Sequence, residues 1–303
     1  MSLSPLLLLL LLVCSSHASH FYGTVMTFIP KNNSADGSVQ VVLRYKLNFH
    51  SCTQEDTWVC ISGDCGTVES LTLNIVDQES SGEWCQREGV MFRQISTNAP
   101  FQLRLNSGNW VSNENGIAAW RALTLVDLRN RSDTGQANRS PQTTILPALR
   151  VPSNCQREIN LLAFDPDGDR VECRYGNTLS ECNPCTPPSV LSLSTSCALS
   201  FSATSRSNEG SYVVQLVMED FPNQNIVLTQ TDGSETGRST NEALSSLPVH
   251  CTVSPNINRS RTGHAPSVSY ALGHDSDPPA TFLDERICAS LHVGGLPGVL
   301  SER

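Results

Sequence analysis

Three aspartates at alternating positions are the residues of this chain best suited to hold a cation. They lie in residues 165–169, which read Asp-Pro-Asp-Gly-Asp, and carboxylates this close repel one another unless a cation or several amides compensate their charge. Hard oxygen ligands suit Ca²⁺. An EF-hand is excluded, because its sixth position requires glycine and Arg170 stands there. Two hypotheses remain: a calcium-binding turn with Asp165, Asp167 and Asp169 as ligands, or a plain polar β-turn, which Pro-Asp-Gly favours without metal.

Cys182 and Cys185 form the second pattern that could carry chemistry. Two cysteines at this spacing can be a redox pair, half of a zinc site or a structural disulfide. A redox pair normally opens a helix, and the two prolines that soon follow make a helix start unfavourable here. A zinc site needs a second close pair, whereas Cys155 and Cys173 lie 18 residues apart. We expect structural disulfides, with metal and redox sites as alternatives.

The first 18 residues carry the marks of a secretory signal peptide. An apolar run ends in small residues, with Ser16 and Ala18 at the −3 and −1 positions of a cleavage site. The run is shorter than the roughly 20 residues that span a bilayer, and no later segment is apolar enough to do so. We therefore expect a secreted, extracellular chain without a membrane span.

The cysteine content is typical of an oxidising compartment, with 12 cysteines in 303 residues. Cleavage after residue 18 removes Cys14 and leaves an odd number. One thiol is then left over, and it could link two chains as a disulfide-bonded dimer. The pairing of the others stays open. The cysteines that we expect in disulfides are Cys52, Cys60, Cys65, Cys85, Cys155, Cys173, Cys182, Cys185 and Cys197.

Four Asn-X-Ser sequons are available for N-glycosylation on an exported chain. They lie at Asn32, Asn130, Asn138 and Asn258, and we expect at least one to be used. The net charge of −9, from 29 acidic and 20 basic residues, argues against a nucleic-acid partner.

Strands dominate the hydrophobic pattern. Short segments with alternating β-branched or aromatic residues are bounded by Gly, Asn, Asp and Ser, and helical periodicity is almost absent. In residues 39–49, for example, one face carries Val41, Leu43, Tyr45 and Leu47. About seven short strands in roughly 110 residues are typical of a β-sandwich. We therefore predict an all-β fold of two disulfide-stapled β-sandwich domains.

The domain boundaries follow from changes in composition. After the signal peptide, residues 19–128 form a first domain that contains cysteines and tryptophans. Residues 129–144, rich in Arg, Asn, Ser and Gly, predict an exposed linker running into the first strand of a second domain at 139–250. Residues 251–303 show no sustained alternation and predict a poorly ordered tail or an atypical end.

The second domain contains an ordered set of motifs. They are Phe164 with the acidic turn, Tyr175, then Pro-Ser-Val-Leu-Ser-Leu at 188–193, Gly-Ser-Tyr-Val-Val at 210–214 and Val-Met-Glu-Asp at 217–220. In this order they resemble a cadherin-like domain of the dystroglycan type, which occurs in extracellular adhesion and matrix proteins. The resemblance covers about residues 139–250 and implies an Ig-like sandwich whose acidic turn joins two early strands. The whole chain is also similar to an uncharacterised set of cysteine-rich secreted or surface proteins of fish.

All four tryptophans lie in the first domain. Trp58 and Trp84 stand beside cysteines, which predicts packing on disulfides in the core. Trp110 lies in a polar stretch, so we consider it as an exposed platform for a sugar or protein ligand, with a core position as the alternative.

Together these features predict a non-catalytic extracellular recognition or adhesion glycoprotein that binds a protein or glycan. Calcium is the one cofactor considered. The first alternative is a soluble truncated form, or decoy, of a larger membrane receptor. The second is a secreted hydrolase, but neither Gly-x-Ser-x-Gly nor His-Glu-x-x-His occurs in the chain, so we expect no enzymatic activity.

Overall fold

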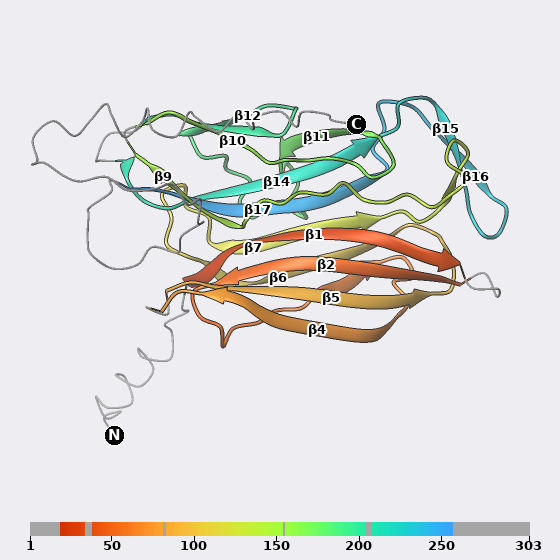
Figure 1. Ribbon diagram of the computed structural model, residues 1–303, viewed down its shortest axis with the longest axis horizontal. Coiled ribbons are helices and arrows are strands. Elements are labelled where there is room, and N and C mark those ends of the chain that lie inside the picture. Colours follow the sequence, from red (N-terminus) through yellow and green to blue (C-terminus); the bar gives the residue numbers. More distant parts are fainter. Residues whose placement is uncertain (1–18, 34–37, 81–82, 154, 204–207, 257–303) are drawn as a thin grey trace, which may run out of the picture.

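The computed structural model describes residues 19–33, 38–80, 83–153, 155–203 and 208–256 (Figure 1). The predicted signal peptide and residues 257–303 of the predicted tail lie outside this range, and no helix in the described part is long and apolar enough to cross a membrane. The regular elements are strands, as the alternation predicted. The fold is all-β and disulfide-stabilised, with β-sandwich layers.

The first half of the chain builds two facing layers. Figure 1 shows β1, β2, β5 and β4 side by side as one layer, and β7, β6 and β3 form the other. Leu43 from the first layer and Leu103 from the second are fully buried in one common core. The strands are β1 (Ser19–Asn33), β2 (Val39–Phe49), β3 (Val59–Ser62), β4 (Thr67–Gln78), β5 (Cys85–Ile95), β6 (Phe101–Trp110) and β7 (Ala119–Val126).

The second half places β11, β14 and β17 in one layer and a three-stranded sheet, ordered β10-β13-β12, beside it. A third small sheet has the order β16-β15-β8. The strands are β8 (Asn130–Arg131), β9 (Ala148–Pro152), β10 (Arg157–Asn160), β11 (Arg170–Tyr175), β12 (Leu191–Leu193), β13 (Ala198–Phe201), β14 (Tyr212–Phe221), β15 (Ile226–Thr229), β16 (Glu235–Arg238) and β17 (Ser245–Asn256).

Strand β17 joins the two halves into one 11-stranded sheet. It pairs with β14 along most of its length, with β7 at Ser246 and with β1 at His250. The boundary that we predicted after residue 250 is therefore wrong, because it falls inside this strand. Cys251 and Val253 are fully buried, and they continue the alternation of the residues before them.

The predicted exposed linker is also wrong in part. Arg129, Arg131, Asn138 and Ser140 are all buried. A polar composition misled the prediction, because these side chains are satisfied by hydrogen bonds inside the protein rather than by water. Ser140 Oγ, for example, bonds to the backbone of Phe28 in β1.

Four disulfides connect described cysteines. Cys182 and Cys185 form one of them, as expected for structural cysteines, and Cys155 is also oxidised. Cys251 is a free thiol with no exposed surface, so it cannot link two folded chains. The dimer predicted through an odd cysteine would have to use another residue. The remaining pairs are Cys52–Cys85, Cys60–Cys65 and Cys173–Cys197.

Candidate functional site

The acidic turn lies between β10 and β11 and is organised by its own backbone. Asp165 Oδ1 accepts hydrogen bonds from the amide nitrogens of Asp167, at 2.7 Å, and Asp169, at 3.2 Å. Gly168 has a φ of 84°, which favours glycine at this position. Backbone amides thus supply part of the compensation that the three carboxylates need.

Arg131 supplies most of the remaining compensation. Its guanidinium is buried and binds both oxygens of Asp169, with Nη2 at 2.8 Å from Oδ1. It also binds both oxygens of Asp133 and donates from Nη1 to Asn138 Oδ1 at 2.7 Å. Burial lowers the pKa of Arg131, but the hydrogen bonds to Asp169 and Asp133 outweigh it and raise the pKa overall. The guanidinium therefore stays charged.

Asp167 points to a second arginine. The backbone nitrogen of Arg139 donates to its Oδ2 at 2.7 Å, and Arg139 Nε donates to its Oδ1 at 2.8 Å. Arg131 Nη1 lies 3.8 Å from the same carboxylate. Asp167, one of the three predicted calcium ligands, is thus engaged by arginines.

Asp220, at the end of β14, takes the place that the sequence suggested for Asp167. Single carboxylate oxygens of Asp165, Asp169 and Asp220 lie within 4.8 Å of one another, which could hold a metal ion. Asp220 belongs to the Val-Met-Glu-Asp segment at 217–220, whose sequence does not indicate a metal ligand. It lies 55 positions after Asp165, so spacing alone could not bring it into the group.

Burial perturbs two carboxyl groups of this cluster. Desolvation raises the pKa of Asp220 to about 7, although hydrogen bonds from Ser245 and Asn138 lower it. Desolvation also raises the pKa of Asp165 to about 6. Its Oδ2 is buried without a hydrogen-bond partner among the described residues. Burial therefore disfavours the charged form of both carboxyl groups, and a cation bound between them would favour it.

The remaining predicted site residues divide clearly. Asn130 is exposed, whereas Asn138 is buried and its Nδ2 donates to Asp220 at 2.7 Å. A glycan on Asn138 is incompatible with this geometry, so that candidate is wrong. Asn32 lies in β1, and Asn258 lies outside the described residues.

Trp110 is not an exposed platform. Its side chain is 1% exposed and packs on Phe21, with ring centroids 4.7 Å apart. It sits at the end of β6, beside the buried His250 of β17. The polar stretch around it suggested exposure. Simple alternation with the buried Leu103 and Leu105 would also place residue 110 on the outer face, but a register shift between Ser107 and Asn109 brings Trp110 to the core face.

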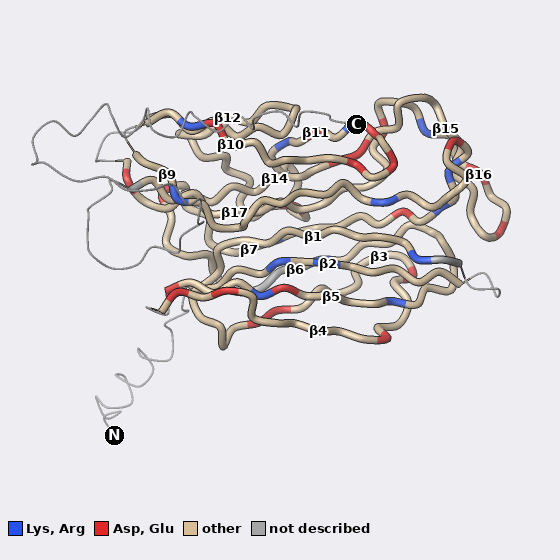
Figure 2. Tube along the Cα trace, in the orientation of Figure 1, with Lys and Arg blue, Asp and Glu red and all other residues tan. Residues whose placement is uncertain are grey.

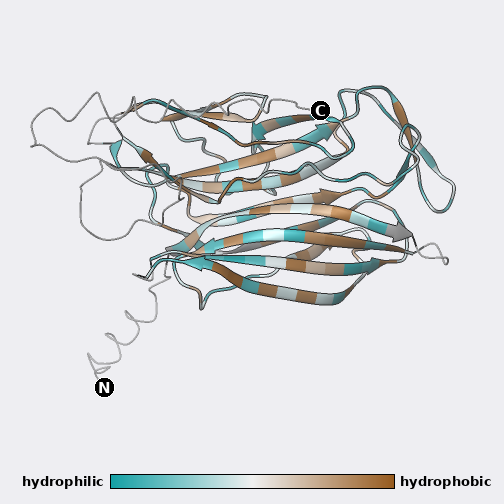
Figure 3. Ribbon diagram, viewed as in Figure 1, coloured by the Kyte–Doolittle hydropathy of each residue, from teal (hydrophilic) through white to brown (hydrophobic). Residues whose placement is uncertain are grey.

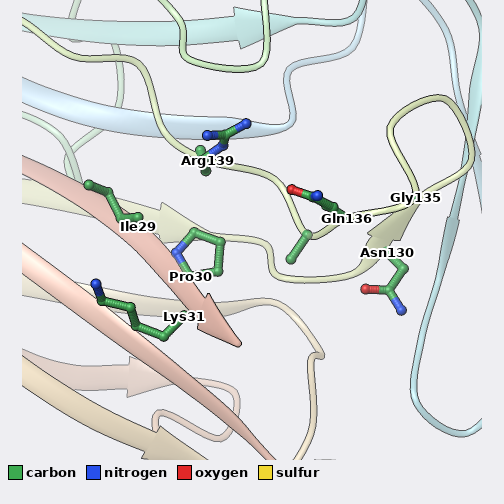
Figure 4. A pocket seen from close by; sticks show the side chains of 8 residues that line it. Ile29, Pro30, Lys31, Asn130, Gly135, Gln136 and Arg139 are labelled. Carbon is green, nitrogen blue, oxygen red and sulfur yellow. The ribbon is translucent and has the colours of Figure 1, made fainter. Parts of the chain in front are cut away.

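A pocket of about 410 Å³ lies where the two halves meet, between the end of β1 and the segment that follows β8 (Figure 4). Its charged lining residues are the basic Lys31 and Arg139, and no acidic, cysteine, serine or histidine residue is among the lining residues. The residues that line it are Ile29, Pro30, Lys31, Asn130, Gly135, Gln136, Ala137 and Arg139.

The edge strand β4 exposes several apolar side chains. Eleven of its 12 residues are exposed, and Val68, Leu71, Ile75 and Val76 each expose about half of their surface, 45–54%. The sequence predicted a strand here but not its position at the end of the sheet. Figure 3 shows hydrophobic positions along β4 at the border of the molecule.

The short strand β3 extends this apolar border. Val59 and Ile61 are exposed at 44% and 37%. A four-residue turn joins β3 to β4, and the Cys60–Cys65 disulfide crosses it. Because β3 has only 4 residues and β4 has 12, most of β4 has no opposing strand.

Comparisons with known proteins give no family for this chain. No protein-family model and no curated protein matches it. Among solved structures, it is similar to the structure described as "Sidekick-1 immunoglobulin domains 1-4", with 8% sequence identity, a TM-score of 0.20, and coverage of 77% of this chain and 68% of that chain.

Proposed function

We propose that this protein is a non-catalytic extracellular recognition protein that engages a partner through the exposed border formed by β3 and β4. Disulfides and β-sandwich layers fit an extracellular adhesion or recognition domain in general. The exposed apolar strand β4 is the observation that carries the more specific proposal.

Strand β4 is unusual for a protein that acts alone. An edge strand exposes unpaired backbone groups, and soluble proteins usually shorten, charge or cover such edges. Here the edge strand is 12 residues long and exposes four large aliphatic side chains. Exposed apolar surface of this kind marks an interaction site. A protein ligand therefore fits this border better than a small molecule.

The buried state of the ionisable groups supports a binding role rather than catalysis. Asp169 and Asp220 are buried and bonded to protein groups. Burial holds the pKa of His250 well below its usual value, at about 3, so this histidine is neutral and shielded from substrate. The decoy-receptor alternative requires a longer related chain that continues into a membrane receptor. The hydrolase alternative requires a measurable hydrolytic activity.

Calcium enters the proposal as a stabiliser of the acidic cluster, with Asp165, Asp169 and Asp220 as ligands. The support is the close approach of the three carboxylate oxygens, within 4.8 Å of one another, and the buried, unpartnered Oδ2 of Asp165. Binding of Ca²⁺ at about 10 μM affinity would add about 2.7 kcal/mol at 1 mM, or roughly 5–10 °C in Tm. Thermal unfolding with Ca²⁺ and with EDTA measures this shift, and Asp220→Asn should abolish it.

Binding of the secreted full-length chain tests the recognition role. The chain is clustered on beads and applied to a panel of cell surfaces and matrix components. We expect Leu71→Lys and Ile75→Lys to abolish binding, because each places a charge on the apolar border. Leu179→Lys, a change at a 66% exposed leucine outside the border, serves as the control. Equal binding by all variants would refute the proposed surface.

A further inference from the structure

We propose that the partner adds a strand to the free edge of β4, and that this strand is apolar in its centre and carries Lys or Arg at both ends. This inference rests on the proposed function, because it specifies how the same border binds and what chemistry it selects. The recognition mode is β-augmentation, in which main-chain hydrogen bonds provide affinity and alternate side chains provide specificity.

The free edge has a regular central segment. Within the described residues β4 pairs only with β5, so its other edge has no partner strand. Arg87 Nη2 donates to the carbonyl oxygen of Leu73 at 3.2 Å. From Ser70 to Ile75 the pairing with β5 runs without a break, from Phe92 to Arg87. Six residues of regular strand span about 20 Å, which is enough for a short extended peptide.

Register shifts limit this segment at both ends. One lies between Val68 and Ser70 and the other between Ile75 and Asp77, so that Glu69 and Val76 have no partner in β5. Such bulges interrupt an edge and limit its extension by further strands. The structure therefore favours a short occupant in the centre over a long continuous sheet.

The apolar side chains of the central segment continue the core of the sandwich. Leu71 lies opposite Met91 and Leu73 opposite Gly89 in β5, and both partners are buried. Residues directly opposite in a sheet share a face, so Leu71, Leu73 and Ile75 lie on the core side of the sheet. Leu73 already packs against the core. An added strand with apolar residues on this face would extend the same core by one strand.

Charge selects the ends of the partner and disfavours a second copy of this chain. Strand β4 contains Glu69 and Asp77 but no lysine or arginine (Figure 2). The nearby Arg87 is already paired with Glu55 at 3.0 Å. Antiparallel pairing of two β4 strands would bring Glu69 of one copy towards Asp77 of the other, and like charges there are unfavourable. Basic residues at both ends of a partner strand would instead be attracted.

A pair of synthetic peptides tests the inference on the full-length secreted protein. The probe has a central run of alternating valine and threonine with two lysines at each end, and its match carries glutamates instead. A third peptide keeps the lysines but has alternate backbone amides methylated on one edge. Binding is measured by isothermal calorimetry, and hydrogen exchange reports the protection of β4 amides.

We expect the lysine peptide to bind at least tenfold more tightly than the other two and to slow exchange in residues 70–75. The double variant Glu69→Lys/Asp77→Lys should reverse the preference towards the glutamate peptide. Leu71→Lys should weaken binding at least tenfold, whereas Leu179→Lys should not. Added salt should weaken binding, because the charged ends are exposed.

Two outcomes would overturn strand addition by a basic partner without refuting the proposed recognition surface. If no peptide binds β4 while Leu71→Lys still abolishes cell or matrix binding, the border is a recognition surface that does not use strand addition. If the wild type is a dimer that Leu71→Lys converts to a monomer, the occupant is a second copy. Failure of both the peptides and the surface variants would refute the proposed function as well.

Discussion

The guanidinium of Arg131 holds both carboxylate oxygens of Asp169, which lies 38 residues later in the chain. Both side chains are almost fully buried, at 1% and 3% exposed. The pair links β8 to the acidic turn before β11. Because Arg131 also binds Asp133 and Asn138, one side chain fixes three parts of this region.

Loss of Arg131 should therefore destabilise the fold strongly. Arg131→Met leaves the buried Asp169 carboxylate without its partner, and removal of one member of a buried pair costs about 3–5 kcal/mol. Urea unfolding of the two proteins measures the difference. Arg170→Met removes a half-exposed pair with Glu172, a hydrogen bond to the Thr240 carbonyl and a contact with the Phe221 ring. It is the control and should cost less than Arg131→Met, because these groups are partly exposed to solvent. An equal loss of unfolding free energy in the two variants would show that the buried Arg131–Asp169 pair stabilises the fold no more than the half-exposed pair does.

Asp220 should make the fold less stable as the pH rises. Its pKa is raised to about 7 in the folded protein, above the value of about 3.9 in an unfolded chain. The folded state therefore binds the proton more tightly, and this contribution is present below about pH 4 and is lost as the pH rises to about 7. As the pH rises through this window, the wild type should lose up to about 1.4 kcal/mol of unfolding free energy per pH unit relative to Asp220→Asn, which has no carboxyl group to titrate there. Calcium-free buffer is required.

His250 provides a control of opposite sign for the pH experiment. Burial lowers its pKa to about 3, so its contribution is present above the unfolded value of about 6.5 and is lost as the pH falls. The free energy of unfolding of His250→Leu should therefore increase relative to that of the wild type as the pH falls from about 6.5 to 4. If the difference in unfolding free energy between the wild type and Asp220→Asn does not change with pH, the pKa of Asp220 is not raised.

Glycosylation should distinguish two neighbouring sequons. Asn130 is exposed beside the pocket in Figure 4, whereas Asn138 is buried between Arg131 and Asp220. Mass spectrometry of glycopeptides from the secreted chain should find a glycan on Asn130 and none on Asn138. Asn138→Gln should also destabilise the fold by about 1–3 kcal/mol, because buried polar groups lose their partner. A glycan on Asn138 in the folded protein would contradict the structure.

Gly89 in β5 should not accept a side chain. A Cβ atom there would lie 2.1 Å from Cζ of Tyr45, whose buried ring covers the glycine. Gly89→Ala should therefore cost about 1–3 kcal/mol through overpacking, measured by chemical denaturation. Gly237→Ala in β16, which would meet no atom within 4 Å, is the control. In a Tyr45→Ala background the cost at Gly89 should largely disappear.

Local patterns in the sequence determined much of this protein. The alternation in residues 39–49 predicted β2 with its bounds and its buried face, because side chains of a strand point alternately to two sides. The cysteine content predicted disulfides, with Cys182 and Cys185 among the cysteines involved, whereas the pairing became known only from the structure. The Asp-Pro-Asp-Gly-Asp motif predicted the turn, since its geometry depends on residues a few positions apart.

Only the tertiary structure decided which distant residues meet. Asp220 joins Asp165 because β14 brings its end beside the turn, and Arg131 reaches Asp169 from a segment whose polar composition suggested solvent. Trp110 is buried, although the polar residues around it suggested exposure. Strand β4 is exposed, and its sequence pattern did not indicate this. A strand pattern fixes which side chains share a face, but the order of strands in the sheet determines which strand lies at the edge. That order depends on contacts between residues far apart in sequence, so it emerges only when the chain folds.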